Sequence, residues 1–134
     1  MVVVDCSVAL ALVLPDEDSP YADGVLAYLS RENQMPVVPA LFRWEFINAL
    51  MMAQRRKRIT DAQFQECSDR WLMSELQEDA MANEKTAITL AGQHRLTIYD
   101  ALYLELAIRR KLKLATLDAV LAKAAGEEGV GFVS

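Results

Sequence analysis

The chain has 134 residues, of which 53% are hydrophobic and 25% are charged, and its formal net charge is -5. A chain of this length fits one domain over residues 1–134, which buries roughly two thirds of its unfolded surface without disulfides. The acidic balance argues against non-specific binding of nucleic acid or anionic membrane over the whole surface. The longest apolar run, Val8 to Leu14, is too short to span a bilayer, so we expect a cytoplasmic protein without a membrane partner.

The cysteines and the histidine exclude several kinds of site. Cys6 and Cys67 lie far apart and outside any zinc-ligand spacing, so we predict two reduced core thiols. His94 is the single histidine, which excludes two-histidine zinc sites and disfavours a histidine-based catalytic triad. Its place near a helix end is typical of a capping or surface residue.

The first residues predict a strand followed by a short helix. Residues 1–4 are apolar and β-branched, as in a central parallel strand that helices cover on both faces. Ser7 can cap a helix through Leu14, and Pro15 ends that helix because the residue before a proline avoids helical geometry.

The remaining elements follow from capping residues, prolines and apolar spacing. These signals predict helices over residues 19–29, 40–57, 60–75, 83–95, 99–111 and 118–125. Short apolar runs predict strands over residues 36–39, 76–79, 112–116 and 131–133, the last at a sheet edge. Thr60 and Gln63 form a capping box that starts the second arm of a helical hairpin. This alternation predicts an α/β fold with a short, doubly wound parallel sheet flanked by helices on both faces.

Four carboxylates lie where a predicted strand ends or a predicted helix begins: Asp5, Glu45, Asp100 and Asp118. In an open α/β fold such positions converge on the edge formed by the carboxyl ends of the strands. Like charges gathered there repel one another unless a cation neutralises them. Oxygen donors without histidine or thiolate suit a hard cation, so the pattern predicts a Mg²⁺ or Mn²⁺ site.

Each acid also has a structural explanation. Asp5 and Asp118 can cap helices, and Asp100 is the third residue after Thr97, as in a capping box. Glu45 is harder to explain in this way, because it lies in the most apolar stretch of the chain and needs a partner or a metal.

Other charged residues are predicted to lie outside the site. Glu105 is five positions past Asp100, which turns it by roughly 140° around the helix. The acids at 16–18, 78–79 and 127–128 are expected to be solvated. The basic clusters at 55–58 and 109–113 fall at predicted helix ends, where they complement the helix dipole or bind phosphate or a partner.

The acids favour phosphoryl chemistry. Without a histidine base, the plausible nucleophile is a water molecule that the metal activates for in-line attack. Ser7 and Thr116 could orient that water or the ligands, or could be ordinary capping hydroxyls.

Four segments, taken together and in order, resemble the acidic motifs of the PIN-domain ribonucleases, and most closely the VapC-type toxins of toxin–antitoxin pairs. These segments are residues 2–7, 44–45, 99–104 and 114–118. The resemblance implies a Mg²⁺- or Mn²⁺-dependent endoribonuclease that cuts RNA, with Asp5, Glu45, Asp100 and Asp118 as ligands. Ser7 and Thr116 match the family's hydroxyl positions.

The same resemblance implies partners. It implies a homodimer, inhibited by a cognate antitoxin whose C-terminal segment lies over the active site and the groove beside the early helices. Met51, Met52 and Trp71 are candidate contacts for the antitoxin or else core residues.

Other families fit less well. Haloacid-dehalogenase-like phosphatases need a second aspartate two residues after the first, where this chain has Ser7, and receiver domains need an aspartate after a middle strand, where it has Pro39 and Ala40. A non-catalytic binding module with the same fold stays open.

Overall fold

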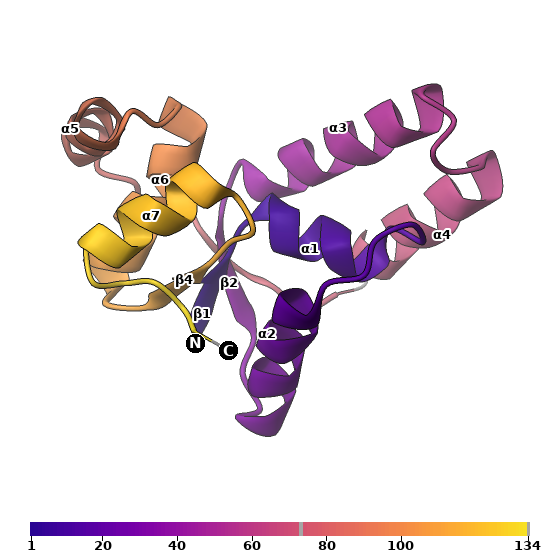
Figure 1. The fold of residues 1–134 in the computed structure, drawn as a ribbon, viewed down its shortest axis with the longest axis horizontal. Coiled ribbons are helices and arrows are strands. Elements are labelled where there is room, and N and C mark those ends of the chain that lie inside the picture. The colour runs from indigo at the N-terminus through magenta and orange to yellow at the C-terminus, as the bar shows by residue number, and fades with distance from the viewer. Residues whose placement is uncertain (73, 134) are drawn as a thin grey trace.

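The computed structural model describes residues 1–72 and 74–133, with side chains for all of them except 71 and 72. These residues form four strands and seven helices in one α/β fold (Figure 1). The elements are β1 (Val2–Val4), α1 (Cys6–Val13), α2 (Pro20–Arg31), β2 (Pro36–Pro39), α3 (Phe42–Arg55), α4 (Asp61–Leu72), β3 (Gln77–Asp79), α5 (Glu84–His94), α6 (Ile98–Arg110), β4 (Lys113–Ala115) and α7 (Ala119–Glu127).

The strands form one parallel sheet in the order β3-β2-β1-β4. Val3 of β1 pairs with Val37 of β2 on one side and with Leu114 of β4 on the other. Val38 continues the sheet to Glu78 of β3. The prediction that the first strand is central is confirmed, and so is the short strand expected near residues 76–79.

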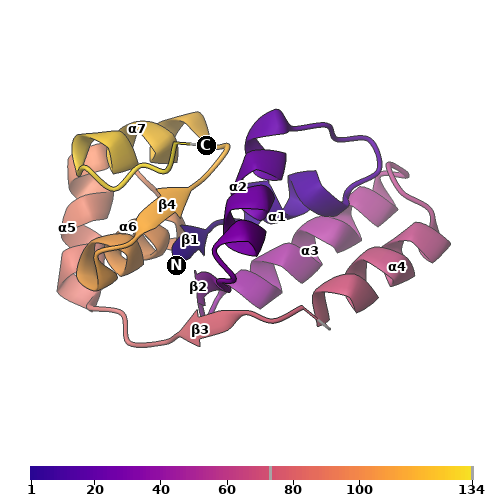
Figure 2. The ribbon, with the colours of Figure 1, turned by 90° about the horizontal axis from the view of Figure 1, so that it is seen from below.

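Helices cover both faces of the sheet, as the apolar β1 predicts. Val3 belongs to a core cluster built with side chains of α3, α6 and α7, whereas Val2 and Val4 pack with α1 and α2. Figures 1 and 2 both show α5, α6 and α7 at one end of the molecule and the α3–α4 hairpin extending to the other end.

The α3–α4 hairpin begins its second arm at the predicted capping box. The Thr60 hydroxyl accepts from the backbone N–H of Gln63 at 3.1 Å, and the side-chain oxygen Oε1 of Gln63 accepts from the backbone N–H of Thr60 at 2.9 Å. The second arm was expected to reach Glu75, but α4 is described only to Leu72, and Ser74 and Glu75 are not helical.

The first helix starts two residues earlier than predicted. Asp5, not Ser7, is its N-cap, because the Asp5 carboxylate accepts from the N–H groups of Ser7 at 3.0 Å and Val8 at 3.4 Å. Ser7 therefore lies within the first turn, and its hydroxyl is available for other contacts.

The expected last strand over 131–133 is reduced to one isolated bridge between Gly131 and Leu114. Phe132 N–H donates to Leu114 C=O at 3.0 Å, but the Phe132 carbonyl then accepts from the Tyr21 hydroxyl at 2.9 Å. The segment leaves the sheet because Phe132 packs on α2 instead of continuing the ladder.

The prediction that His94 is a surface residue is wrong, whereas Glu127 is solvent-exposed as predicted. The His94 side chain is 7% exposed, and it lies 3.1 Å from Glu127 and 2.8 Å from Glu128. The histidine therefore ties the end of α5 to the end of α7, while the side chain of Glu127 stays 53% exposed and that of Glu128 is partly exposed.

Arg109 and Arg110 of the second basic cluster form a largely buried ion-pair network with Glu105 and Asp79. The prediction that Asp79 is solvated is therefore wrong. Glu105 is 1% exposed, and Arg109 lies 2.7 Å from it and 3.0 Å from Asp79. Arg110 adds a longer contact of 3.5 Å to Asp79. Hydrogen bonds from Arg109 lower the pKa of Asp79. This acid is therefore ionised, and the arginines offset its negative charge.

Replacing Arg109 by Met should therefore destabilise the protein by about 3–5 kcal/mol, because Glu105 would remain buried without a counter-charge. The matched control Arg110→Met removes only the longer contact and should cost about 0–1 kcal/mol. Urea unfolding measures both changes. Equal losses in the two variants would contradict the central place of Arg109.

Candidate metal centre

Asp5 is held at the junction between β1 and α1. Its N–H donates to Ala115 C=O of β4 at 3.2 Å, which extends the β1–β4 pairing by one residue. Its side chain is 5% exposed and caps α1. The carboxylate therefore lies at the carboxyl edge of the sheet, at the end of the central strand.

Two hydroxyl groups bind the two Asp5 oxygens. The Ser7 hydroxyl donates to Oδ1 at 2.5 Å, and the Thr116 hydroxyl donates to Oδ2 at 2.6 Å. In turn, Leu117 N–H donates to Ser7 Oγ at 2.8 Å, and Asp118 N–H donates to Thr116 Oγ1 at 3.0 Å. Both hydroxyls therefore link Asp5 to the segment after β4, and neither is an ordinary helix cap.

Glu45 lies in the first turn of α3 and is half-buried. Its Oε1 accepts from the Tyr103 hydroxyl of α6 at 2.7 Å. Sequence reasoning did not select Tyr103. Two signals pointed to it. Tyr103 lies about one helical turn after Asp100, and Glu45, in an apolar stretch, needed a polar partner.

Asp100 and Asp118 lie in or before the first turns of α6 and α7. The Asp100 N–H donates to the Thr97 hydroxyl at 3.1 Å, so Thr97 is the cap of α6. The Asp118 carboxylate caps α7 by accepting from Leu121 N–H at 2.9 Å. Asp118 is therefore a helix cap, as one of its two explanations predicted. This role still leaves it at the candidate site.

Electrostatic repulsion connects the four carboxylates. Burial raises the pKa of Asp5, and burial together with Asp100 and Asp5 raises the pKa of Glu45. Burial, then the charges of Asp118 and Asp5, raise the pKa of Asp100. Within the described residues no arginine or lysine forms an ion pair with any of the four. The site thus gathers negative charge that the chain itself does not neutralise.

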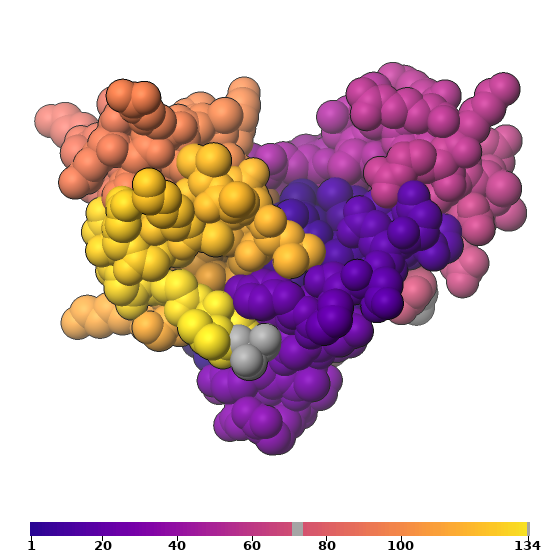
Figure 3. Space-filling model, in the orientation of Figure 1, coloured from indigo at the N-terminus to yellow at the C-terminus, as the bar shows by residue number. Residues whose placement is uncertain are grey.

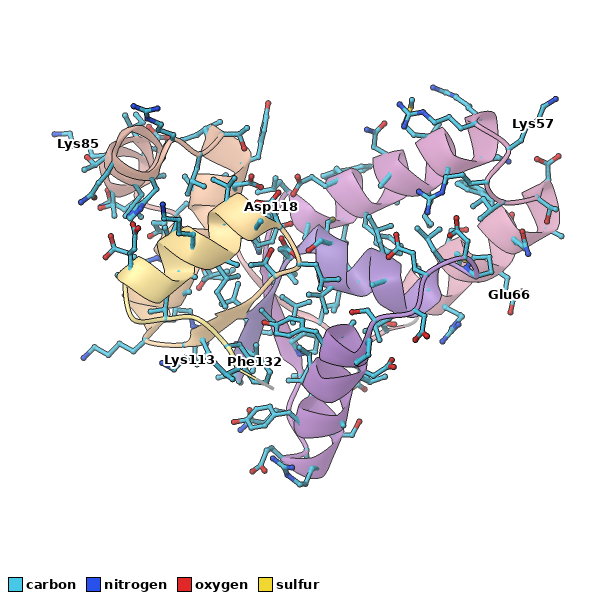
Figure 4. The ribbon with its side chains drawn as sticks, viewed as in Figure 1. Lys57, Glu66, Lys85, Lys113, Asp118 and Phe132 are labelled. Carbon is cyan, nitrogen blue, oxygen red and sulfur yellow. The ribbon has the colours of Figure 1, made fainter. Side chains whose placement is uncertain are left out.

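The surface around the site is concave. A hollow separates the lobe of α5, α6 and α7 from the lobe of α3 and α4, and the strands run toward it (Figures 1 and 3). Asp118 lies at the start of α7, on the side of this hollow (Figure 4).

The donors fit a hard divalent cation in chemistry and charge, since they are carboxylate and hydroxyl oxygens. Among the described residues, however, no three aspartate, glutamate, histidine or cysteine side chains are already grouped so that they could hold one ion. The oxygens of Asp5 are instead directed toward Ser7 and Thr116. The two hydroxyl groups thus fix the orientation of the Asp5 carboxylate.

Cys6 is close to the acids but has a different environment. Its thiol donates to Phe42 C=O at 3.6 Å, and burial and the Glu45 charge raise its pKa. The thiol is therefore protonated at neutral pH and is a poor metal ligand. Both cysteines are free, as predicted.

The PIN domain family matches residues 2–127 of the chain. The chain therefore belongs to the PIN domain family. Proteins of this family are generally nucleases that act on RNA, and they typically bind Mg²⁺ or Mn²⁺. Membership thus indicates a nuclease, and the four acids of the candidate centre lie within the matched residues.

A solved structure supports the fold of this PIN domain. The chain is similar to the protein in the crystal structure of PAE2754 from Pyrobaculum aerophilum, with a TM-score of 0.69 and 23% identity over 92% of this chain and 78% of that one. No curated protein sequence matches the chain. None of the helices in the described residues combines the length and apolar character needed to cross a membrane.

The raised pKa of Asp100 leads to a prediction about stability without metal. The folded state binds a proton at Asp100 more readily than the unfolded chain does, so this group lowers stability as pH rises through its folded pKa. In a chelator, Asp100→Asn should therefore be more stable than the wild type at about pH 7.5, and the difference should shrink toward about pH 4.

Urea unfolding at the two pH values measures this difference. The control Asp18→Asn removes the same charge from an exposed loop and should change stability little at either pH. A variant at position 100 that is less stable at neutral pH would show that repulsion is not the dominant effect there.

Proposed function

We propose that this PIN domain is a Mg²⁺- or Mn²⁺-dependent endoribonuclease that hydrolyses RNA phosphodiester bonds. The observation that carries the proposal is the set of four carboxylates near one edge of the sheet, none of which pairs with an arginine or lysine in the described part of the chain. Repulsion between neighbouring carboxylates costs stability, and a bound cation removes that cost by offsetting their charges.

In this proposal Asp5, Glu45, Asp100 and Asp118 hold the cation. When bound, the cation supplies an activated water molecule and neutralises the charge that develops on the phosphodiester. Four ligand positions on separate elements allow the chain to accept an ion in the hollow rather than on a single loop.

The supporting residues orient the ligands. Ser7 and Thr116 hold Asp5 in one rotamer by donating to its two oxygens, and Tyr103 does the same for Glu45. Such partners of metal ligands fix their direction and tune their affinity for the ion.

We further propose that the domain acts in the cytoplasm as the toxin of a toxin–antitoxin pair, as a homodimer inhibited by a cognate antitoxin. Support comes from a groove of about 410 Å³ that α1, α2, the start of β2 and residues 74–76 line with apolar and polar side chains. Leu12 and Leu26 line it, and Leu26 is 50% exposed, so it offers some apolar surface to a partner segment beside the early helices. None of the four carboxylates lines this groove.

The residues of the α3–α4 hairpin that were predicted to contact the antitoxin give weaker support to this proposal. Met51 and Met52 are each half-buried, which leaves part of each side chain available to a partner. The side chain of Trp71 lies outside the described residues.

A non-catalytic binding module is the second candidate. The specific observation in its favour is that no three potential ligands are already grouped around one point in the described part of the chain. Such a module would gain stability from Mg²⁺ or Mn²⁺ without cutting RNA.

Replacing Asp100 by Asn should abolish cleavage of total cellular RNA and relieve the growth arrest that the toxin proposal predicts on expression of the chain. The reason is that the variant loses one ligand charge while keeping the fold. Gel analysis of RNA with Mg²⁺, Mn²⁺ or chelator measures the first effect.

The control Asp18→Asn should keep full activity, because its side chain is exposed and lies in a loop. Millimolar Mg²⁺ should also raise the melting temperature of the wild type through binding to the folded state. Such a rise without any RNA cleavage would favour the binding module.

Thr116→Val should weaken the apparent affinity for the metal by about 10- to 100-fold, because Asp5 Oδ2 and Asp118 N–H both lose their partner. Titration of cleavage with Mg²⁺ measures this change. The control Thr89→Val removes a hydroxyl that bonds only within α5 and should leave the titration unchanged. An unchanged curve for Thr116→Val would remove this hydroxyl from the site.

A further inference from the structure

His94, at the end of α5, lies between two carboxylates at the end of α7. Its Nδ1 is 3.1 Å from Glu127 Oε2, and its Nε2 is 2.8 Å from Glu128 Oε1. The imidazole is 7% exposed, so water has little access to either nitrogen. Both ring nitrogens therefore face an oxygen that, in an ionised carboxylate, can only accept a hydrogen bond.

This geometry suits the charged imidazole and not the neutral one. The imidazolium has two N–H donors, whereas the neutral ring has one N–H and one nitrogen without a proton. In the neutral form, Glu127 or Glu128 would face a nitrogen lone pair at hydrogen-bond distance, and that contact would be repulsive. Imidazoles change charge between about pH 5 and 8. The number of glutamates that His94 can hold therefore depends on pH.

Other charged groups surround His94 and its two glutamates. Four cations line the two grooves to which these three residues belong: Arg95, Lys123, Lys111 and Lys113. Within residues 1–72 and 74–133, none of these four pairs with Glu127 or Glu128. Their positive charges oppose the charged imidazole, which the two carboxylates in direct contact favour. His94 is thus the cation that holds both glutamates.

The two glutamates lie where the chain turns back to cover β4. Just after them, Val130 N–H donates to Ala125 C=O at 2.9 Å, and Leu114 N–H of β4 donates to Val130 C=O at 2.7 Å. Phe132 N–H then donates to Leu114 C=O at 3.0 Å. Because β4 is the last strand of the sheet, these residues occupy its outer edge. An uncovered strand edge can pair with another chain, so this cover protects the fold.

We propose that His94 is a pH-sensitive clasp: its charged form holds Glu127 and Glu128 and keeps the following segment on the edge of β4, and its neutral form releases one glutamate and loosens that cover. This inference goes beyond the proposed ribonuclease function and does not depend on it, because none of the four site acids belongs to the clasp. The charged form makes both contacts. The stabilisation is therefore present at low pH and is lost as pH rises through the titration of the ring.

Amide hydrogen exchange of the full chain, followed by NMR, measures how tightly the cover is held. The Leu114 amide reports directly, because its partner is the Val130 carbonyl of the cover. After correction for the intrinsic exchange rate, its protection should fall about tenfold between about pH 5.5 and pH 8, the worth of one charge-assisted contact. The amide of Leu50, buried in the middle of α3, is the internal reference and should change less.

Variants assign this change to the clasp. His94→Gln stays neutral and should remove the extra pH dependence of the Leu114 amide. Glu128→Gln should reduce it, because a carboxamide can donate to an unprotonated ring nitrogen as well as accept from a protonated one. The matched control Glu84→Gln removes an exposed charge at the start of α5 and should keep the dependence of the wild type.

Nitrogen NMR of the ring tests the clasp without any substitution, since His94 is the single histidine of the chain. At about pH 5.5 the folded wild type should carry a proton on both ring nitrogens. The inference is overturned by a neutral ring at this pH, by protection of Leu114 that changes no more than that of Leu50, or by the same change in His94→Gln as in the wild type. If His94→Gln does not fold, Glu128→Gln and the wild-type ring spectrum decide the question.

Discussion

Burial of the Asp5 carboxylate is the constraint on which the carboxyl edge of the sheet depends. A buried carboxylate is costly unless its oxygens accept hydrogen bonds. Here one oxygen accepts from the first turn of α1 and from Ser7, and the other accepts from Thr116. Because these donors come from α1 and from the segment after β4, satisfying one side chain fixes the exits of two neighbouring strands relative to each other.

Hydrogen bonds stabilise this edge without removing its charge. Asp79 also lies at the end of a strand, but Arg109 and Arg110 neutralise it and lower its pKa. The pKa of Asp5 and that of Asp100 are instead raised, chiefly by burial and further, for Asp100, by neighbouring acids. The same sheet edge thus contains Asp79, whose ion pairs stabilise the fold, and a group of acids whose repulsion costs stability. Residues that cost stability in this way are expected where they serve a function rather than folding.

The sequence was sufficient for the parallel sheet, and it led to the expectation that the acids lie near one edge of that sheet, where the charges of Asp100 and Asp5 raise the pKa of Glu45. It was not sufficient for contacts between distant segments. Ser7 and Thr116 meet at Asp5 across more than a hundred residues, and Arg109 reaches Asp79 across thirty. Local capping rules therefore assigned Ser7 to a helix start that Asp5 occupies, and the polar character of residues 78–79 led to the expectation that Asp79 is solvated.

Capping does not compete with the metal binding proposed for these acids. A carboxylate that caps a helix lies at its N-terminus, where the partial positive charge of the helix favours an anion. Asp5 and Asp118 both cap helices, so the backbone offsets part of the cost of keeping them charged side by side. Asp118 still has a second oxygen that its bond to Leu121 N–H does not use. A fold that starts several helices at one sheet edge can thus concentrate carboxylates there at a lower cost than a surface of loops could.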